Sequence, residues 1–276
     1  MSSRPRCTRA RGSLTFRGVA VSLAALCAAA IASSPAPAAA LSSAGALTLE
    51  GAARPAAATG PATADARSDA ETVTLPAAAF AHGRAVAVRA APRPGARLIA
   101  KLPQLRYDYR PTVFELIGRR RERSGELWMR LHVPGRPNGQ KGWARATDFD
   151  VRDSVAATRI VIDRSRRRLR LIADGRTVVR APVAVGTRAA PTPLGSFYVT
   201  AAFRPSDPFL GSWAFETSAY AAITDWPRGG VVGLHGTSRP ASVGRRASHG
   251  CLRVYNRVIQ RLRRTVRLGT PIVIRA

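Results

Sequence analysis

The sequence predicts a mainly β protein with two small folded domains behind a long N-terminal stretch that belongs to neither. Short apolar segments alternate with polar residues from about residue 84 onward, and turns rich in Gly, Pro and Asn separate them. A helical spacing of apolar residues follows near the C-terminus. With 276 residues, 46% of them hydrophobic and 22% charged, the chain is long enough to bury one or two cores.

Residues 1–40 are predicted to form a secretory signal peptide. The first 18 residues contain five arginines and no acidic residue. An apolar run over residues 19–31 comes next, and small residues follow up to Ala40. We expect cleavage after Ala40 and a protein located outside the cytoplasmic membrane, in association with the cell wall. A retained transmembrane anchor is the alternative. The run falls short of the ~20 apolar residues that span a bilayer, so we expect no stable membrane span.

Residues 41–79 are predicted to form an Ala- and Pro-rich linker. The stretch is rich in Ala, Pro, Gly and Thr, contains Pro55, Pro61 and Pro76, and lacks helical or strand periodicity. A segment of this composition buries too little apolar surface to fold alone, so it typically spaces a folded domain away from its attachment.

Residues 80–152 are predicted to form a small β-barrel. Strands are expected at residues 86–88, 112–117 and 127–133, with a closing strand from residue 142, and turns containing Gly and Pro lie between them. Several short strands with this punctuation are typical of small barrels.

Part of this region resembles the SH3-like modules that precede wall-active domains in bacteria. The resemblance rests on the strand at residues 127–131, the turn at residues 136–139 and the pair Gly142-Trp143. It implies a module that binds wall peptides or packs against a catalytic domain. We expect Trp128 and Trp143 in the core of the barrel.

Residues 158–276 carry the strand pattern of a second β domain. Apolar residues alternate with polar ones over residues 160–163, and leucines alternate with arginines over residues 168–171. This pattern predicts a hairpin with one buried face and a basic outer face. The pair Asp174-Gly175 is a strong signal for a type I′ turn before the next strand.

A short helix and a last strand are predicted near the C-terminus. Apolar residues at helical spacing from Val254 to Leu262 predict the helix, and Asn256 is expected to cap it. Gly269 ends the connection, and residues 271–274 have the pattern of the closing strand.

The cysteines indicate a reactive thiol. Cys7 and Cys27 lie in the predicted signal peptide, so the mature chain keeps Cys251 alone and forms no internal disulfide. A single thiol in an exported protein points to reactive chemistry or to pairing with another molecule.

The charge of the chain is strongly positive. Removal of the five signal arginines lowers the formal net charge from +28 to +23. The arginines are spread along the whole chain behind an export signal, so we expect no nucleic-acid partner. Attraction to anionic cell-wall polymers and a plain compositional bias are equally good interpretations.

The residues around Cys251 suggest nucleophilic catalysis. Twelve residues separate His235 from the segment 248–253, which contains a second histidine and the cysteine. A thiol attacks carbonyl groups as a thiolate, so it needs a base or a positive neighbour, and the two histidines are available for this. The adjacent glycines let backbone amides approach a substrate carbonyl and stabilise an oxyanion.

A zinc site is the alternative interpretation of the same residues. His235, His249 and Cys251 would supply three ligands, but the sequence places no fourth Cys or His nearby at a zinc-module spacing. We therefore expect no metal.

These residues resemble the signature of the L,D-transpeptidase (YkuD-type) catalytic domain, in which a His-Gly is followed by Ser/Thr-His-Gly-Cys, an aliphatic residue and Arg or Asn. Residues 185–187 and 192–197 resemble its Gly-Thr and Thr-Pro-x-Gly-x-Phe motifs, and residues 269–274 resemble its closing strand. The resemblance covers residues 158–276 and implies a β-sandwich catalytic domain with a short helix after the cysteine. Residues 209–226 follow the pattern only in part, and a lid over the site would come from there.

The resemblance implies a role for each catalytic residue. Cys251 would be the acylated nucleophile. His235 would be the general base, oriented by the backbone carbonyl of Gly236 in place of a carboxylate. The backbone amides of His249, Gly250 and Cys251 would line the oxyanion hole.

Arg253, Ser248 and Thr237 are the candidate substrate-binding residues. Arg253 would pair with a substrate carboxylate, with an internal salt bridge or hydrogen bonds to loop carbonyls as an equal alternative. Ser248 is expected mainly to brace the loop, and Thr237 to offer a pocket hydroxyl or form a turn. Thr192 is expected to have a structural role.

The implied activity is L,D-transpeptidation of peptidoglycan stem peptides without a metal or organic cofactor. The thiolate would attack the carbonyl of the third residue of a tetrapeptide stem and expel D-alanine. An amine of a neighbouring stem would then resolve the thioester into a 3→3 cross-link. Alternatives are an L,D-carboxypeptidase that hydrolyses the same intermediate, attachment of a wall-anchored protein to the stem, and a non-catalytic peptidoglycan-binding wall protein.

Overall fold

The computed structural model describes residues 69–223 and 227–276, all within one compact unit, Ala58–Ala276. The predicted signal peptide and most of the predicted linker lie outside the described residues. Within the described ranges, no helix is long and apolar enough to cross a membrane.

Folded structure begins earlier than the boundary predicted at residue 80. Residues 69–72 are helical, and strand β1 (Ala77–Ala81) starts inside the predicted linker. This strand consists almost entirely of alanines, which fit between two neighbouring strands, β4 and β7. Alanine has little intrinsic preference for strands, so the sequence gives no local signal for this element.

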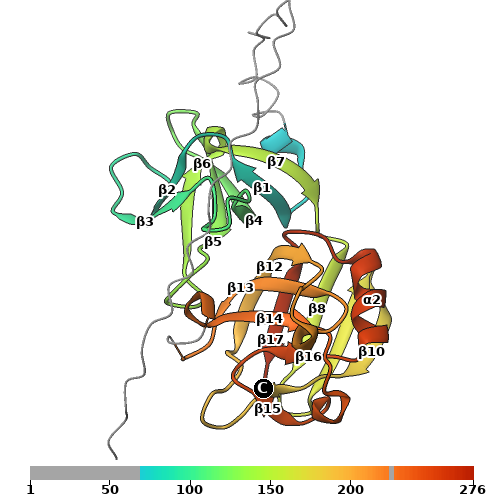
Figure 1. Cartoon of the computed structure of the whole chain (residues 1–276). Coiled ribbons are helices and arrows are strands. Elements are labelled where there is room, and N and C mark those ends of the chain that lie inside the picture. The colour runs from blue at the N-terminus through green and yellow to red at the C-terminus, as the bar shows by residue number, and fades with distance from the viewer. Residues whose placement is uncertain (1–68, 224–226) are drawn as a thin grey trace, which may run out of the picture. The chain divides into compact units, whose positions relative to one another are not determined.

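The N-terminal domain is a β domain with the strand order β3-β2-β6-β5-β4-β1-β7 (Figure 1). Besides β1, its elements are β2 (Ala85–Arg89), β3 (Leu98–Pro103), β4 (Val113–Arg121), β5 (Leu127–His132), β6 (Lys141–Arg145), the 3-10 turn η1 (Ala146–Asp148) and β7 (Phe149–Ser154). The four strands expected from the sequence correspond to β2, β4, β5 and β6. Trp128 is buried as expected, whereas Trp143 is partly exposed with the Arg130 guanidinium 5.8 Å from its ring centre. The SH3-like character of this domain stays a prediction.

The C-terminal domain is built on a sheet with the strand order β10-β9-β8-β17-β12-β13-β14-β16. Its strands are β8 (Thr158–Asp163), β9 (Arg168–Ala173), β10 (Arg176–Pro182), β12 (Gly195–Phe203), β13 (Ala214–Tyr220), β14 (Val231–His235), β16 (Leu252–Arg253) and β17 (Pro271–Arg275). A small parallel pair, β11 (Val185–Gly186) and β15 (Arg246–Ser248), lies beside it, and 3-10 turns η2 (Pro208–Leu210), η3 (Pro227–Gly230) and η4 (Pro240–Ser242) connect strands. The protein is therefore mainly β, as predicted.

The predicted sandwich is a single sheet that curls on itself at β12. Residues 195–198 of β12 pair with β17, whereas residues 199–203 pair with β13, and the register shifts between Val199 and Ala201. One core of branched and aromatic side chains fills the inside of the curl, with residues from both halves of the sheet. A strand shared between two halves is a common way to turn a corner in a β structure.

The predicted hairpin and helix are both present. Asp174 and Gly175 have positive φ values of 48° and 73°, as a type I′ turn requires between β9 and β10. The helix α2 (Asn256–Thr265) packs Val258, Ile259 and Leu262 into the core, and it lies beside β10 (Figure 1). Val254, expected in the helix, is buried in the segment before it.

The last strand, β17, occupies the centre of the sheet. It runs parallel to β8 on one side and antiparallel to β12 on the other, with Ile272 opposite Ile160 and Phe197. Its inward residues Ile272 and Ile274 are almost completely buried. The predicted strand at residues 271–274 is confirmed, and it joins the two halves of the curled sheet.

The position of β17 predicts a large effect of a core truncation. Ile274→Ala is expected to lower the free energy of unfolding by about 2–5 kcal/mol, since it leaves a cavity between packed strands. Val178→Ala, at an exposed position of β10, serves as the control and should stay within about 0.5 kcal/mol of the parent. Denaturant unfolding measures both. Equal losses for the two variants would contradict a central β17.

Candidate active site

Parallel pairing of β14 with β16 brings the two predicted histidine and cysteine segments together. Leu234 lies opposite Leu252, and His235 lies opposite Arg253. Side chains alternate along a strand, so the residue two positions before His235, which is Gly233, shares its face. Cys251 comes directly before β16 and lies against Gly233.

Gly233 contacts the sulfur atom through its backbone. Its N–H donates to Cys251 Sγ at 3.4 Å. A Cβ atom on Gly233 would lie 3.5 Å from His235 Cδ2 and 3.9 Å from Cys251 Sγ, which are ordinary contact distances, so Gly233 lies next to both side chains. The sequence analysis missed this residue.

His235 is held as a neutral base. The side chain is 2% exposed, and its Nδ1 lies 2.6 Å from the carbonyl oxygen of Gly236. A carbonyl oxygen only accepts hydrogen bonds, so Nδ1 carries the proton and Nε2 is the acceptor. Burial lowers the pKa of His235 from 6.5 to about 4, with the Arg253 cation acting in the same direction. The imidazole is therefore neutral and able to accept a proton at neutral pH.

Cys251 is a protonated thiol in the resting protein. Burial raises the pKa of the Cys251 thiol above its ordinary value, although the Gly233 amide and the Arg253 guanidinium oppose this effect. The pair is thus a neutral thiol beside a neutral imidazole. The thiolate needed for attack has to form by transfer of the proton to a base.

The loop before Cys251 is fixed by its own hydrogen bonds. Ser248 Oγ donates to the Cys251 carbonyl at 2.6 Å and accepts the Gly250 N–H at 3.2 Å. Gly250 has φ of 122°, and a Cβ atom there would lie 2.7 Å from Ala221 Cβ, so glycine is required. Ser248 therefore braces the loop as expected.

One of the backbone amides expected to form the oxyanion hole already donates a hydrogen bond within the protein. The Gly250 N–H is hydrogen-bonded to Ser248, whereas no hydrogen bond within the described residues occupies the Cys251 N–H. A backbone amide next to the attacking sulfur is the usual donor to a tetrahedral oxyanion. The Cys251 amide is the better placed of these two donors.

Thr192 ties a distant motif to the cysteine loop. The fully buried Thr192 hydroxyl donates to the Gly250 carbonyl at 2.8 Å and accepts the Gly186 N–H at 2.8 Å. Thr192 thus connects the β11 strand with the residue before the nucleophile, which agrees with the structural role expected for it.

Arg253 projects from β16 into the same site. Its side chain stacks on Phe209 with 4.6 Å between the guanidinium carbon and the ring centre, and its Nε has no hydrogen-bond partner among the described residues. None of the carboxylates that the structure describes lies within ion-pairing distance of it. The internal salt bridge weighed from the sequence is therefore not formed there.

Asn256 clamps the loop behind His235. Its Oδ1 accepts the N–H groups of Ser212 and Thr237, each at 3.1 Å. The prediction that Asn256 caps α2 is wrong, because Tyr255 is the N-cap residue and makes no side-chain cap. The amide side chain is instead used by two loops that the sequence gives no reason to bring together.

A cavity of about 290 Å³ opens over these groups. Cys251, His235, His249 and Arg253 line it, with His249 at an exposed position. Thr237, Ser248, Gly236 and Gly250 are not among its lining residues. The remaining lining residues are Phe203, Asp207, Phe209, Leu210, Ala214, Phe215, Glu216, Val231 and Gly233.

Thr237 serves the loop. Its hydroxyl accepts the Arg239 N–H at 2.9 Å, and the residue is 3% exposed. This arrangement corresponds to the turn weighed for Thr237 from the sequence. Its role as a substrate-binding residue stays a prediction.

Comparisons with known proteins bear on this domain. Residues 157–274 match the family model of the L,D-transpeptidase catalytic domain, YkuD. A protein of Bacillus licheniformis described as a putative L,D-transpeptidase YkuD is 33% identical over 117 residues, and its counterpart in Bacillus subtilis is 31% identical over 116 residues. Each match covers 42% of this chain and 64% of the relative, so the likeness is to less than two thirds of those proteins.

Solved structures show a weaker likeness. An L,D-transpeptidase from Mycobacterium tuberculosis H37Rv is 15% identical and has a TM-score of 0.39, over 55% of this chain and 90% of that one. At this score the likeness carries no argument, and the description of the C-terminal domain rests on its own strand pairing.

Glu216 is a wall residue of the cavity that the sequence analysis missed. It is 5% exposed on β13 and forms an ion pair with Arg106, which follows β3. Arg106 Nη1 also donates to the Thr200 carbonyl at 3.1 Å. A buried carboxylate is normally paired, and here an arginine more than a hundred residues away compensates it. No local pattern indicates such a pair.

Among the residues that the structure places, no group of three or more His, Cys, Asp or Glu side chains is close enough to hold a metal ion. The cavity brings together a thiol, two imidazoles, a guanidinium and the carboxyl groups of Asp207 and Glu216.

The neutral thiol predicts a steep pH dependence of alkylation. The rate of Cys251 labelling by iodoacetamide should rise about tenfold per pH unit between about pH 6 and pH 8, without a plateau, because the raised pKa keeps the thiolate scarce. Arg253→Gln removes a stabilising cation and should shift the profile to higher pH, whereas exposed Arg264→Gln should not. Labelling followed by intact mass measures this. A plateau near neutral pH would indicate a thiolate–imidazolium pair instead.

The clamp of Asn256 predicts a graded loss of stability. Asn256→Ala leaves the Ser212 and Thr237 amides without their acceptor and should cost about 1–3 kcal/mol of unfolding free energy. Asn256→Asp keeps the acceptor at the start of α2, where a negative charge is favoured, and should lose clearly less. Denaturant titration compares the two. Equal losses would show that the shared acceptor does not matter.

Proposed function

We propose that this protein is an exported L,D-transpeptidase that forms 3→3 cross-links in peptidoglycan through a thioester on Cys251. The observation that carries the proposal is the buried, neutral pair of Cys251 and His235, whose Nδ1 is fixed by the Gly236 carbonyl. The match of residues 157–274 to the L,D-transpeptidase catalytic domain supports it.

The first half-reaction forms the acyl-enzyme. The Cys251 thiol gives its proton to His235 Nε2 as Sγ attacks the carbonyl carbon of the third stem residue. The negative oxygen that results accepts a hydrogen bond from the Cys251 amide. The His235 imidazolium then protonates the nitrogen of the departing D-alanine, the C–N bond breaks, and a thioester remains on Sγ.

The second half-reaction resolves the thioester. The side-chain amine of a neighbouring stem attacks the same carbonyl carbon and gives a proton to His235. The C–S bond breaks as His235 returns the proton to the sulfur, which restores the neutral pair. Water in place of the amine would give the L,D-carboxypeptidase outcome with the same residues.

Arg253 is proposed to bind a carboxylate of the stem peptide. Its guanidinium lines the cavity next to the nucleophile, without an ion pair to any described carboxylate. A guanidinium remains charged at neutral pH even when burial lowers its pKa, and it binds carboxylates through two parallel hydrogen bonds. Ser248 and Thr237 would support the pocket through their hydrogen bonds to the backbone of its loops.

The proposed location is outside the cytoplasmic membrane, at the cell wall. The proposal rests on the N-terminal sequence, where five arginines, an apolar run over residues 19–31 and small residues up to Ala40 have the pattern of a secretory signal. Export would bring the active site to its substrate.

Intact mass tests the proposed activity. The full chain and its Cys251→Ala variant are incubated with a disaccharide-tetrapeptide and, separately, with a carbapenem that acylates the nucleophile. We expect an adduct on the parent alone and a cross-linked dimer released from the muropeptide. Loss of D-alanine without a dimer would assign the carboxypeptidase activity. Absence of any adduct on folded protein would leave a non-catalytic wall-binding protein.

A further inference from the structure

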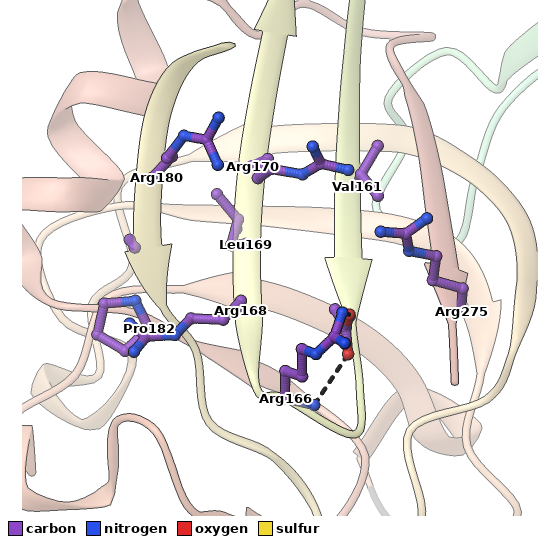
Figure 2. A pocket seen from close by; sticks show the side chains of 10 residues that line it. Val161, Arg166, Arg168, Leu169, Arg170, Arg180, Pro182 and Arg275 are labelled. Carbon is purple, nitrogen blue, oxygen red and sulfur yellow. Dashed lines mark hydrogen bonds and ion pairs between the residues drawn. The ribbon is translucent and has the colours of Figure 1, made fainter.

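A groove lined by arginines lies on the outer face of the sheet, away from the residues of the active-site cavity. It has a volume of about 430 Å³ and shares no lining residue with that cavity. Figure 2 shows its side chains on β8, β9, β10 and the end of β17. Its five arginines, hereafter the arginine groove, are Arg166, Arg168, Arg170, Arg180 and Arg275.

The arginines are arranged in a regular array. Arg170 on β9 lies opposite Arg180 on β10, and Arg168, two residues earlier on the same face, lies opposite Pro182. Same-face residues on one strand are about 7 Å apart, and adjacent strands are about 5 Å apart. The sheet therefore presents Arg168 and Arg170 two residues apart along β9, with Arg180 beside Arg170 on the neighbouring strand.

This arrangement costs stability in the absence of an anion. Like charges directly opposite each other on neighbouring strands repel, and Arg170 and Arg180 are such a pair. No ion pair within the described residues involves Arg168, Arg170, Arg180 or Arg275. A bound polyanion would relieve the repulsion.

The one acid of the groove is committed to a turn. Asp163 accepts hydrogen bonds from the Arg166 N–H at 2.8 Å and the Ser165 hydroxyl at 3.0 Å. The Arg166 amide is the main reason that the pKa of Asp163 is lowered, so its carboxylate stays ionised within the turn between β8 and β9. It also lies 3.5 Å from Arg166 Nη1, and the strand register places it opposite Arg168 on β9 and Arg275 on β17. Arg170 and Arg180 are thus the groove arginines that have no acid opposite them.

The lining of the groove includes apolar residues and no aromatic residue. Val161 and Pro182 lie among the arginines, whereas the Leu169 side chain is fully buried in the core below them. Single-stranded nucleic acids bind by stacking bases on aromatic side chains, and the lining offers none. A polymer with phosphates separated by uncharged carbon linkers fits the alternation of arginine and apolar contacts.

We propose that the arginine groove binds a linear phosphodiester polymer with polyol linkers. Arginine forks bind phosphate oxygens through two hydrogen bonds each, and the two-residue separation of Arg168 and Arg170 along β9 would hold successive phosphates about 7 Å apart. Binding there would hold the domain on an anionic wall polymer while the active-site cavity stays open. The inference goes beyond the proposed catalysis and does not depend on it.

A matched pair of variants tests the groove. Binding of the full chain to fluorescently labelled poly(glycerol phosphate) is measured at several salt concentrations. Arg168→Gln/Arg170→Gln/Arg180→Gln removes three groove charges, and Arg93→Gln/Arg120→Gln/Arg123→Gln removes three exposed charges elsewhere. We expect the groove variant to bind at least about tenfold more weakly and its salt slope to fall by about 2, at about 0.7 per phosphate contact. The control should keep the affinity and slope of the parent.

Other outcomes would overturn the proposal. Equal losses in both triple variants would show that net charge alone attracts the polymer. Equal or tighter parent binding to poly-glutamate, to an oligonucleotide or to anionic phospholipid vesicles would exclude the phosphodiester polymer as the preferred occupant. Iodoacetamide labelling of Cys251 and thermal unfolding verify that each variant is folded. If the triple variant does not fold, Arg180→Gln alone should lower the slope by about 0.7, and an unchanged slope would refute the groove.

Discussion

The parallel pairing of β14 with β16 is the constraint on which the candidate active site depends. It places His235 beside Arg253 and the glycine at position 233 against the Cys251 sulfur. The strand β16 has only two residues, so its position depends on its pairing with β14. The Thr192 hydroxyl, the Ser248 hydroxyl and the Asn256 clamp all act on segments that flank this pair. They stabilise the loops that the pairing creates.

Burial gives the reactive pair its electrostatic character. Both groups lie in a poorly solvated site, which favours the neutral form of each and keeps the thiol protonated at rest. In the proposed mechanism, charge develops on these groups only when a substrate carbonyl is present and its oxygen can be stabilised. The Gly236 carbonyl fixes the tautomer that makes this possible, without a third ionisable group.

The sequence predicted the parts of the site that lie in continuous motifs. Cys251, His235, His249 and Arg253 meet in one cavity as expected, and the hairpin at Asp174-Gly175, the C-terminal helix and the closing strand are where their patterns indicated. The contributions of Gly233, Asn256 and Phe209 arise from contacts between segments distant in sequence, for which a single sequence has no signal. The alanine strand β1 and the corner in β12 could not be predicted from the sequence for another reason. Both are determined by pairing with neighbouring strands, and the residues themselves have no local propensity that indicates them.

The central place of β17 has a consequence for how the domain assembles. β17 separates β8 from β12, so the strands that carry the arginine groove and those that carry the cysteine are joined in the sheet through it. Its pairing with β8 links Ile272 to Ile160, a contact of high sequence separation of the kind that slows folding. Until it forms, β8 and β12 each expose an unpaired strand edge, which is prone to pair with other chains. Because β17 follows the other described strands of the domain in the sequence, these two edges are covered only once the last strand of the domain has been synthesised.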